Sequence, residues 1–219
     1  MFKFCQGCSV NILAGGFCAP CRQTLLNLRR QQAPQALPSM SEFERAENEL
    51  NGIAAGGSLF LYQGVMRRVI MRAKVRNDLL ALNGLVELFA SHPEVLKLAK
   101  NSDVLVPAPS SLWGRMRGRF DLAQSMALGL GAEIDLPVAL MPWVAYMRFR
   151  KRAGSNEYRE EKSREATPSK LLFKGLRVLV IDDVMTTGKT MSSTLMLALK
   201  LGAEKASGIA LASGQHLGG

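Results

Sequence analysis

The chain alternates short apolar runs with longer stretches in which apolar residues recur every three or four positions. The stretches of the second kind predict amphipathic helices over residues 65–74, 79–92, 121–129 and 189–201, with Pro93 marking a break or restart. The apolar runs have the length and composition of strands: "SLFLYQG" (58–64), "DVLV" (103–106), "KLLF" (170–173), "RVLVIDDV" (177–184) and "ASGIALAS" (206–213). Strands that alternate with helices predict an α/β doubly wound domain with an open parallel sheet. Because "RVLVIDDV" is largely apolar, we expect it to be a central, parallel strand.

Basic residues follow one side of the helix predicted at 65–74. Val65, Val69 and Ala73 recur at the spacing of one apolar face, with Met66 and Ile70 beside them. The charged positions around them are Arg67, Arg68, Arg72, Lys74 and Arg76. Two interpretations stay open, a solvated polar face and a groove for a polyanion.

Two segments are polar and poor in core-forming residues. Residues 31–57 mix Gln, Pro, Ala and acids, and we interpret them as a linker between a module at 1–30 and the main domain at 58–219. Residues 147–170 are almost wholly polar, and so long a loop within a domain is usually functional or disordered. No apolar stretch reaches the length of a membrane span, and the first ten residues lack the core of a secretion signal. We therefore expect a cytoplasmic protein with no membrane span.

All four cysteines lie near the start of the chain, at Cys5, Cys8, Cys18 and Cys21. Two C-x2-C pairs on tight turns can present four thiolates to a tetrahedral Zn²⁺, at ~2.3 Å per sulfur. We therefore predict a structural, closed zinc site. Two disulfides and iron in a knuckle are the alternatives, and a reducing cytoplasm argues against the disulfides.

The 219-residue chain carries a formal net charge of +10. Such an excess favours anionic partners, namely nucleic acid, phosphorylated metabolites or an anionic membrane face. A basic but inert surface is the alternative.

Candidate chemistry is concentrated in "VLVIDDVMTTGKT" (178–190). Asp182 and Asp183 follow the apolar run, at the edge of a parallel sheet where ligands bind. The hydroxyl-rich turn after them leads into a helix N-terminus, which suits a phosphate. A nucleotide-hydrolase P-loop, G-x-x-x-x-G-K-S/T, is excluded because its first glycine would stand at Asp183. A sugar phosphate satisfies both features, with its hydroxyls on the acids and its phosphate at the helix.

The same stretch resembles the phosphoribosyl diphosphate motif of type I phosphoribosyltransferases. The resemblance implies that Asp182 and Asp183 bind the ribose hydroxyls and that magnesium bridges ribose and diphosphate. It implies a phosphoribosyl diphosphate site made of Asp182, Asp183, Val184, Met185, Thr186, Thr187, Gly188, Lys189 and Thr190, in which the last five cradle the 5-phosphate. Some family members carry an acid where this chain has Thr186.

A wider resemblance adds the four-Cys module, Tyr62 and Gly64 before a basic helix, the "VPAPSS" loop and an Arg-rich element before a helix. Together these are similar to the ComF/ComFC competence family. This implies that Pro107, Ala108, Pro109, Ser110 and Ser111 form the diphosphate loop and that residues 150–168 form a mobile hood.

The competence resemblance implies a role in natural transformation, with single-stranded DNA and other DNA-uptake proteins such as a helicase as partners. A metabolic phosphoribosyltransferase with an amine acceptor and a metabolite-sensing regulator are the alternatives. The DNA-binding candidates are Arg67, Arg68, Arg72, Lys74, Arg76, Arg115, Arg117, Arg119, Arg150, Lys151 and Arg152.

Overall fold

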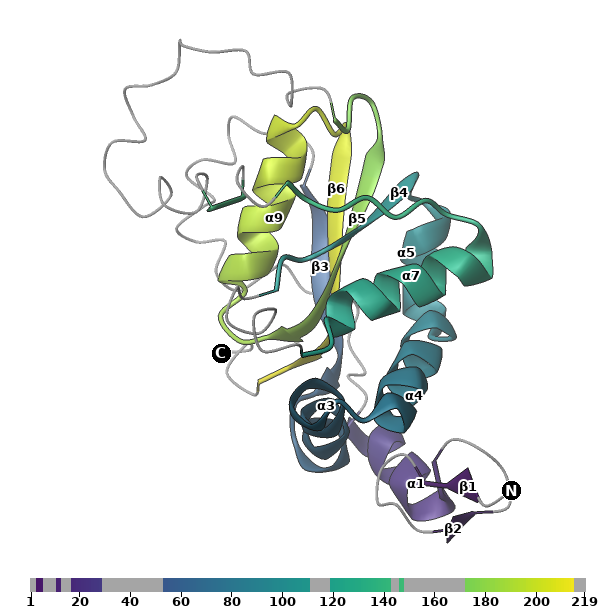
Figure 1. The fold of residues 1–219 in the computed structure, drawn as a ribbon. Coiled ribbons are helices and arrows are strands. Elements are labelled where there is room, and N and C mark those ends of the chain that lie inside the picture. The colour runs from purple at the N-terminus through teal and green to yellow at the C-terminus, as the bar shows by residue number, and fades with distance from the viewer. Residues whose placement is uncertain are drawn as a thin grey trace.

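The apolar run at 178–181 lies in the middle of a parallel sheet, as the sequence predicts. The computed structural model describes residues 3–5, 11–12, 17–28, 53–110, 119–142, 146–147 and 172–214. Within these residues the main sheet has the strand order β3–β6–β5–β4, with every neighbouring pair parallel (Figure 1). Its strands are β3 (Ile53–Leu61), β4 (Val104–Pro107), β5 (Arg177–Met185) and β6 (Lys205–Ser213).

Helices cover both faces of this sheet (Figure 1). The helices are α3 (Gly64–Arg76), α4 (Leu79–Ala90), α5 (Pro93–Lys100), α7 (Leu122–Ile134) and α9 (Lys189–Lys200). Leu179 and Ile181 of β5 share a core with α3, α4, α5 and α7. Val178 and Val180, which alternate with them, share a second core with α9. This alternation of apolar residues on both sides explains why β5 is apolar at four successive positions. The fold is therefore α/β with an open parallel sheet, as predicted.

Local sequence explains where the helices begin and end. Asp78 accepts hydrogen bonds from the N–H groups of Leu80 and Ala81, and Asp121 accepts one from that of Gln124, so each carboxylate caps a helix. Pro93 stands in the first turn of α5, where its missing N–H costs nothing. The predicted helices at 65–74, 79–92 and 189–201 are confirmed within two residues, and α7 continues five residues beyond the predicted end.

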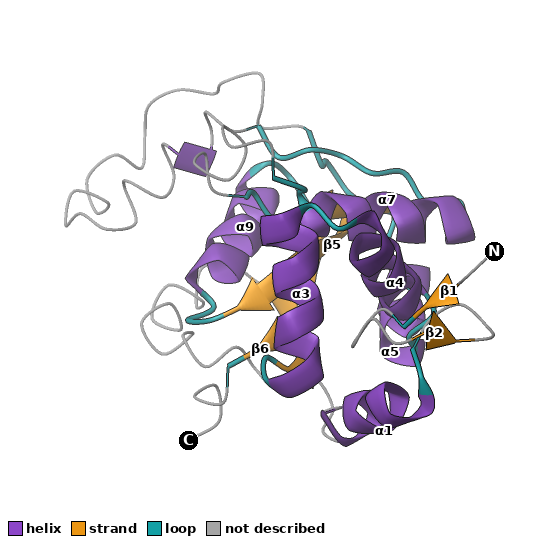
Figure 2. Cartoon of the chain, turned by 60° about the horizontal axis from the view of Figure 1, so that its bottom comes forward, coloured by secondary structure: helices purple, strands orange, loops and turns teal. Residues whose placement is uncertain are grey.

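A small N-terminal unit lies next to α3 (Figures 1 and 2). Its described elements are β1 (Lys3–Phe4), β2 (Asn11–Ile12), which pairs with it in antiparallel fashion, and α1 (Ala19–Leu28). Helix α1 contacts α3 and β3, and Cys5 and Cys21 are buried in the same core as α3. The unit is therefore packed onto the main domain.

Two strand predictions differ from the structure. The strand expected at 58–64 begins at Ile53 and ends at Leu61, because Gly64, with φ 52°, already begins α3. In the expected strand "KLLF", Leu172 and Phe173 lie in a turn instead, and residues 170–171 are outside the described part of the chain. The N–H of Phe173 donates to the carbonyl of Leu201, so the turn pairs with the end of α9 instead of with a strand.

Several sequence expectations fall outside the described residues: Cys8, Ser111, most of the proposed linker, the Arg-rich element at 111–118 and the proposed hood at 150–168. Of the described helices, none combines the length and the apolar character needed to cross a membrane.

Candidate functional site

The carboxyl ends of β4 and β5 bring two of the predicted segments together. Pro107 is in register with Ile181, and the N–H of Ala108 donates to the carbonyl oxygen of Ile181 at 2.7 Å. The loop at 107–110 therefore starts beside Asp182, as ligand loops of open parallel sheets do. The hydroxyl oxygen of Ser110 is buried and has no hydrogen-bond partner among the described residues, so its hydrogen-bonding capacity is unused there.

The acid pair lies within β5 rather than beyond it, because the strand continues to Met185. The strand predicted at 177–184 is confirmed within one residue, and it includes both acids. Asp182 is in register with Ala210 of β6, so backbone pairing holds both acids in place. The side chain of Asp182 accepts a hydrogen bond from the N–H of Asp183 at 2.8 Å. The two carboxylates therefore have fixed positions at the end of the sheet.

An ion pair connects this acid pair to α3. The Nζ of Lys74 lies 2.7 Å from Oδ2 of Asp183, whose side chain is 13% exposed. Sequence reasoning placed Lys74 among the DNA-binding candidates and missed this contact. The spacing could have indicated this contact, because Lys74 follows the buried Met66 and Ile70 at intervals of four residues and therefore lies on the same side of the helix.

The surroundings of Asp182 raise the proton affinity of its carboxyl group. The pKa of Asp182 is raised from 3.8 to about 7, first by burial and then by the negative charge of Asp183, with a smaller contribution from Asp121. The hydrogen bond from the N–H of Asp183 and the positive charge of Lys74 act in the opposite direction. Asp182 keeps some exposed surface as a residue, but its carboxyl group lies among protein atoms. Near neutral pH this carboxyl can therefore exchange a proton when a ligand binds.

The turn after β5 forms an anion-binding feature at the start of α9. Gly188 has φ 74°, a left-handed conformation that favours glycine, and it precedes the first residue of the helix. Among the described residues, no side chain caps this helix N-terminus, so its N–H groups remain available. Thr186, Thr187 and Lys189 are exposed beside them. A phosphate would meet free N–H groups, hydroxyls and the positive end of the helix dipole here.

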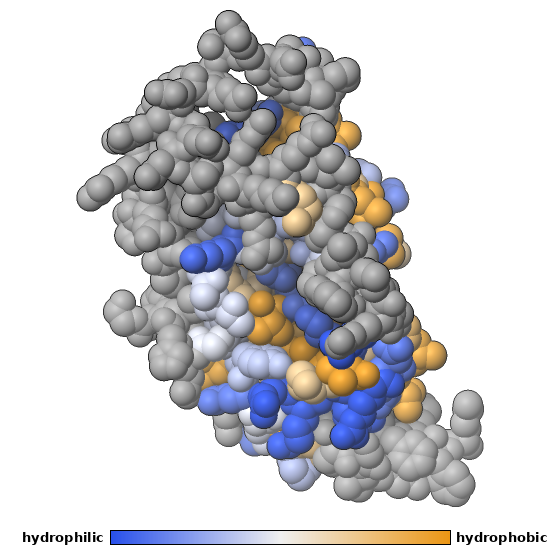
Figure 3. Space-filling model, turned by 60° about the vertical axis from the view of Figure 1, so that its left-hand side comes forward, coloured by the Kyte–Doolittle hydropathy of each residue, from blue (hydrophilic) through white to orange (hydrophobic). Residues whose placement is uncertain are grey.

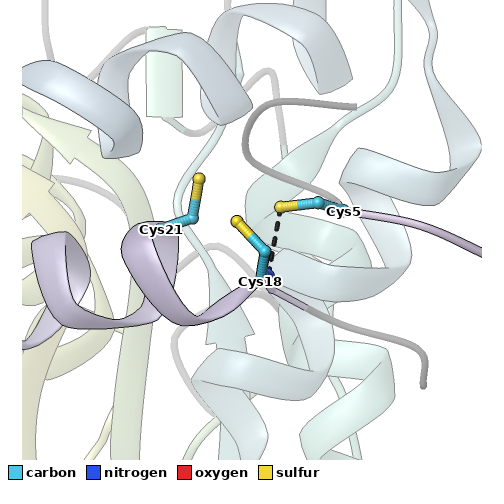
Figure 4. Close-up of side chains that lie close together, drawn as sticks. All are labelled: Cys5, Cys18 and Cys21. Carbon is cyan, nitrogen blue, oxygen red and sulfur yellow. Dashed lines mark hydrogen bonds between the residues drawn. The ribbon is translucent and has the colours of Figure 1, made fainter. Parts of the chain in front are cut away.

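Three of the predicted metal ligands lie close together (Figure 4). The Sγ atoms of Cys5, Cys18 and Cys21 all lie within 4.8 Å of one another, and the N–H of Cys18 donates to Sγ of Cys5 at 3.2 Å. Tetrahedral zinc with sulfur ligands at ~2.3 Å separates neighbouring sulfurs by about 3.8 Å, which these positions fit. Cys8, the predicted fourth ligand, is outside the described residues, so the structure supports a metal site of at least three thiolates.

The predicted DNA-binding residues divide into three groups. Arg115, Arg117, Arg150, Lys151 and Arg152 lie outside the described residues. Arg72 and Lys74 are paired with carboxylates, Arg72 through its Nε to Oδ2 of Asp78 at 2.9 Å. The exposed group consists of Arg67, Arg68, Arg76 and Arg119. Figure 3 shows strongly hydrophilic residues gathered at the lower end of one face, the end where Figure 1 places α3.

The Phosphoribosyl transferase domain family matches residues 121–217, which include β5, α9 and β6. A purine phosphoribosyltransferase structure from Pyrococcus horikoshii Ot3 is similar at 20% sequence identity and a TM-score of 0.33, covering 60% of this chain and 71% of that one. No curated protein matches the chain. The family match contains the whole Asp182–Thr190 segment, so this part of the chain is similar to the Phosphoribosyl transferase domain family.

Proposed function

We propose that this protein binds phosphoribosyl diphosphate, together with Mg²⁺, at the carboxyl edge of β4 and β5. One observation carries the proposal: the edge combines an acid pair, a left-handed glycine before a free helix N-terminus, and the loop at 107–110. Each feature has a matching group on the ligand, which carries vicinal hydroxyls, a 5-phosphate and a diphosphate. The family match over residues 121–217 supports the same ligand class.

Different groups of residues would bind different parts of the ligand. Asp182 and Asp183 accept hydrogen bonds from the ribose hydroxyls, while the N–H groups from Gly188 onward and the threonine hydroxyls hold the 5-phosphate. The loop at 107–110, with the buried hydroxyl of Ser110, faces the diphosphate. Bound Mg²⁺ would neutralise diphosphate charge, and the nearby carboxylate oxygens are ligands that this ion accepts.

We further propose that the protein handles single-stranded DNA, in the manner that the competence resemblance implies. Exposed Arg67, Arg68 and Arg76 of α3 support this, because α3 also carries Lys74 into the sugar site. A strand bound along α3 would therefore lie next to bound phosphoribosyl diphosphate. Zinc in the N-terminal unit would brace α3 from the other side, since α1 contacts it.

The sugar site is tested with a double variant, Asp182→Asn with Asp183→Asn. We expect it to lose binding of phosphoribosyl diphosphate and Mg²⁺ in titration calorimetry, because neutral amides accept weaker hydrogen bonds than carboxylates. Asp135→Asn is the matched control, an exposed aspartate at the end of α7, in a left-handed conformation that asparagine also adopts. Undiminished binding by the folded double variant would reject the assignment of the site.

The DNA proposal needs a separate measurement. Labelled single-stranded DNA is titrated at several salt concentrations, with and without phosphoribosyl diphosphate and Mg²⁺. We expect salt-dependent binding that weakens when Arg67, Arg68 and Arg76 are all changed to Ala, and that does not change in a Lys97→Ala, Lys100→Ala control on α5. A protein that binds the sugar ligand but no DNA at low salt would instead support a metabolic transferase.

A further inference from the structure

Within the described residues, the carboxylate of Asp183 is held from one side only. Its Oδ2 atom pairs with Lys74 at 2.7 Å, whereas its Oδ1 atom accepts no hydrogen bond within the described part of the chain. The contact joins residues 109 positions apart in the sequence, from α3 to the end of β5. One oxygen is therefore fixed by the protein, and the other remains available to a ligand hydroxyl.

We propose that Lys74 is a positioning residue that makes the site selective for a sugar with vicinal hydroxyls, because its ion pair holds the carboxylate of Asp183 in one orientation. This inference rests on the proposed function, since it assigns a role within the same sugar site. The ammonium of Lys74 limits the rotation of the Asp183 side chain, which within the described residues is otherwise anchored only through its backbone.

The charge balance at the edge explains why such a residue is needed. Asp121 and Asp183 both act on Asp182 as negative charges, so the site gathers carboxylates where an anionic ligand must bind. Lys74 is the cation that counteracts them at Asp182 and that contacts Asp183. Without it, the carboxylates at this edge would lack the positive charge of Lys74, and Asp183 would lose the contact that orients it.

The alternative is that Lys74 leaves Asp183 and binds a ligand phosphate itself. The two roles differ in which ligands they affect. A residue that acts through Asp183 affects sugars with hydroxyls, whereas a phosphate-binding lysine affects every phosphorylated ligand, including inorganic diphosphate. The observed contact favours the first role, because Lys74 Nζ lies on the carboxylate that would face the sugar.

The test measures binding of ribose 5-phosphate, 2-deoxyribose 5-phosphate and inorganic diphosphate with Mg²⁺ by calorimetry. For the unaltered protein we expect ribose 5-phosphate to bind more tightly than its deoxy analogue. In Lys74→Met we expect ribose 5-phosphate to bind roughly ten- to a hundredfold more weakly, the range for one hydrogen bond to a charged group. The preference over the deoxy analogue should shrink, and diphosphate binding should not change.

Three comparisons keep the outcome interpretable. Lys74→Arg should retain part of the selectivity, and Lys97→Met, an exposed lysine on α5, should retain all of it. In an Asp183→Asn background, Lys74→Met should have no further effect on selectivity. This last comparison uses Asp183→Asn as its own reference, so it remains valid if either substitution lowers stability.

Two results overturn the inference while leaving the sugar site in place: unchanged selectivity in folded Lys74→Met, and an equal loss for all three ligands. The second would assign Lys74 to a phosphate. Failure of the unaltered protein to bind either phosphoribosyl diphosphate or ribose 5-phosphate would overturn the proposed function itself, and this inference with it.

Discussion

Replacing Asp182 with Asn should make the protein more stable at alkaline pH, although it removes a predicted ligand-binding group. The folded state raises the pKa of Asp182 from 3.8 to about 7, with burial as the main cause and the charge of Asp183 as the second. Asparagine has the same shape and no charge, and its Oδ1 atom can still accept the hydrogen bond from the N–H of Asp183. The substitution therefore removes the cost of ionisation while keeping the local contact.

The magnitude follows from the linkage between proton binding and folding. Between pH 3.8 and about 7 the folded protein keeps a proton that the unfolded chain has lost, so stability falls as pH rises through this window. At about 1.4 kcal/mol per pH unit, the full penalty at pH 8 is on the order of 4 kcal/mol. Part of this loss of stability is already present at pH 5, because that pH lies above 3.8. The advantage of Asp182→Asn should therefore grow by about 2–3 kcal/mol between pH 5 and pH 8.

The assay is urea unfolding followed by far-ultraviolet circular dichroism at pH 5 and pH 8, without ligand. Asp135→Asn provides the matched control, because it makes the same chemical change at an exposed aspartate outside the site. If Asp182→Asn has no greater advantage at pH 8 than at pH 5, or is less stable than the unaltered protein at pH 8, the burial argument is refuted. A positive result would show that this site retains a destabilising acid, which points to a functional reason.

Two further predictions concern packing and metal. Gly131→Ala in α7 should lower the free energy of unfolding by about 1–3 kcal/mol, because a Cβ there would stand 2.6 Å from the backbone oxygen of Leu136. Denaturant titration measures this loss, and Ala132→Ser, on the exposed side of α7, is the control. Cys21→Ser should reduce bound zinc in elemental analysis and lower the melting temperature. A chelator should lower the melting temperature of the unaltered protein in the same way, and if it has no effect, Cys21 serves only as a buried core residue.

The sequence was sufficient for the features that depend on local pattern. Four apolar positions in a row identified β5 as a central strand. The physical reason is that successive side chains of this strand are buried in two different cores, one on each face of the sheet. The acids directly after this run located the candidate site, because parallel strands end at a common edge. The periodicity of Val65, Val69 and Ala73 identified α3, and all three are buried.

Features that depend on distant contacts were not accessible in the same way. Lys74 looked like one more member of a basic stripe, because its partner Asp183 is remote in the sequence and only the packing of α3 against the sheet brings them together. "KLLF" has strand composition, but the carbonyl groups of Leu201 and Gly202, after α9, accept hydrogen bonds from the N–H groups of Phe173 and Gly175, so its described half, residues 172–173, is a turn. In both cases hydrogen bonds between distant parts of the chain determine the local structure, and the local sequence composition does not indicate these bonds.

The two ion pairs on α3 also change what the basic surface can contribute to DNA binding. With Arg72 and Lys74 engaged by carboxylates, Arg67, Arg68 and Arg76 are the arginines of α3 that remain exposed. At ~0.7 per phosphate on single strands, three contacts contribute about 2 to the slope of log affinity against log salt. Raising salt fourfold should then weaken this contribution about 20-fold, and the triple Ala variant should lower the slope by about 2. A slope that is unchanged in the folded triple variant would contradict DNA binding along α3, however tightly the protein binds at low salt.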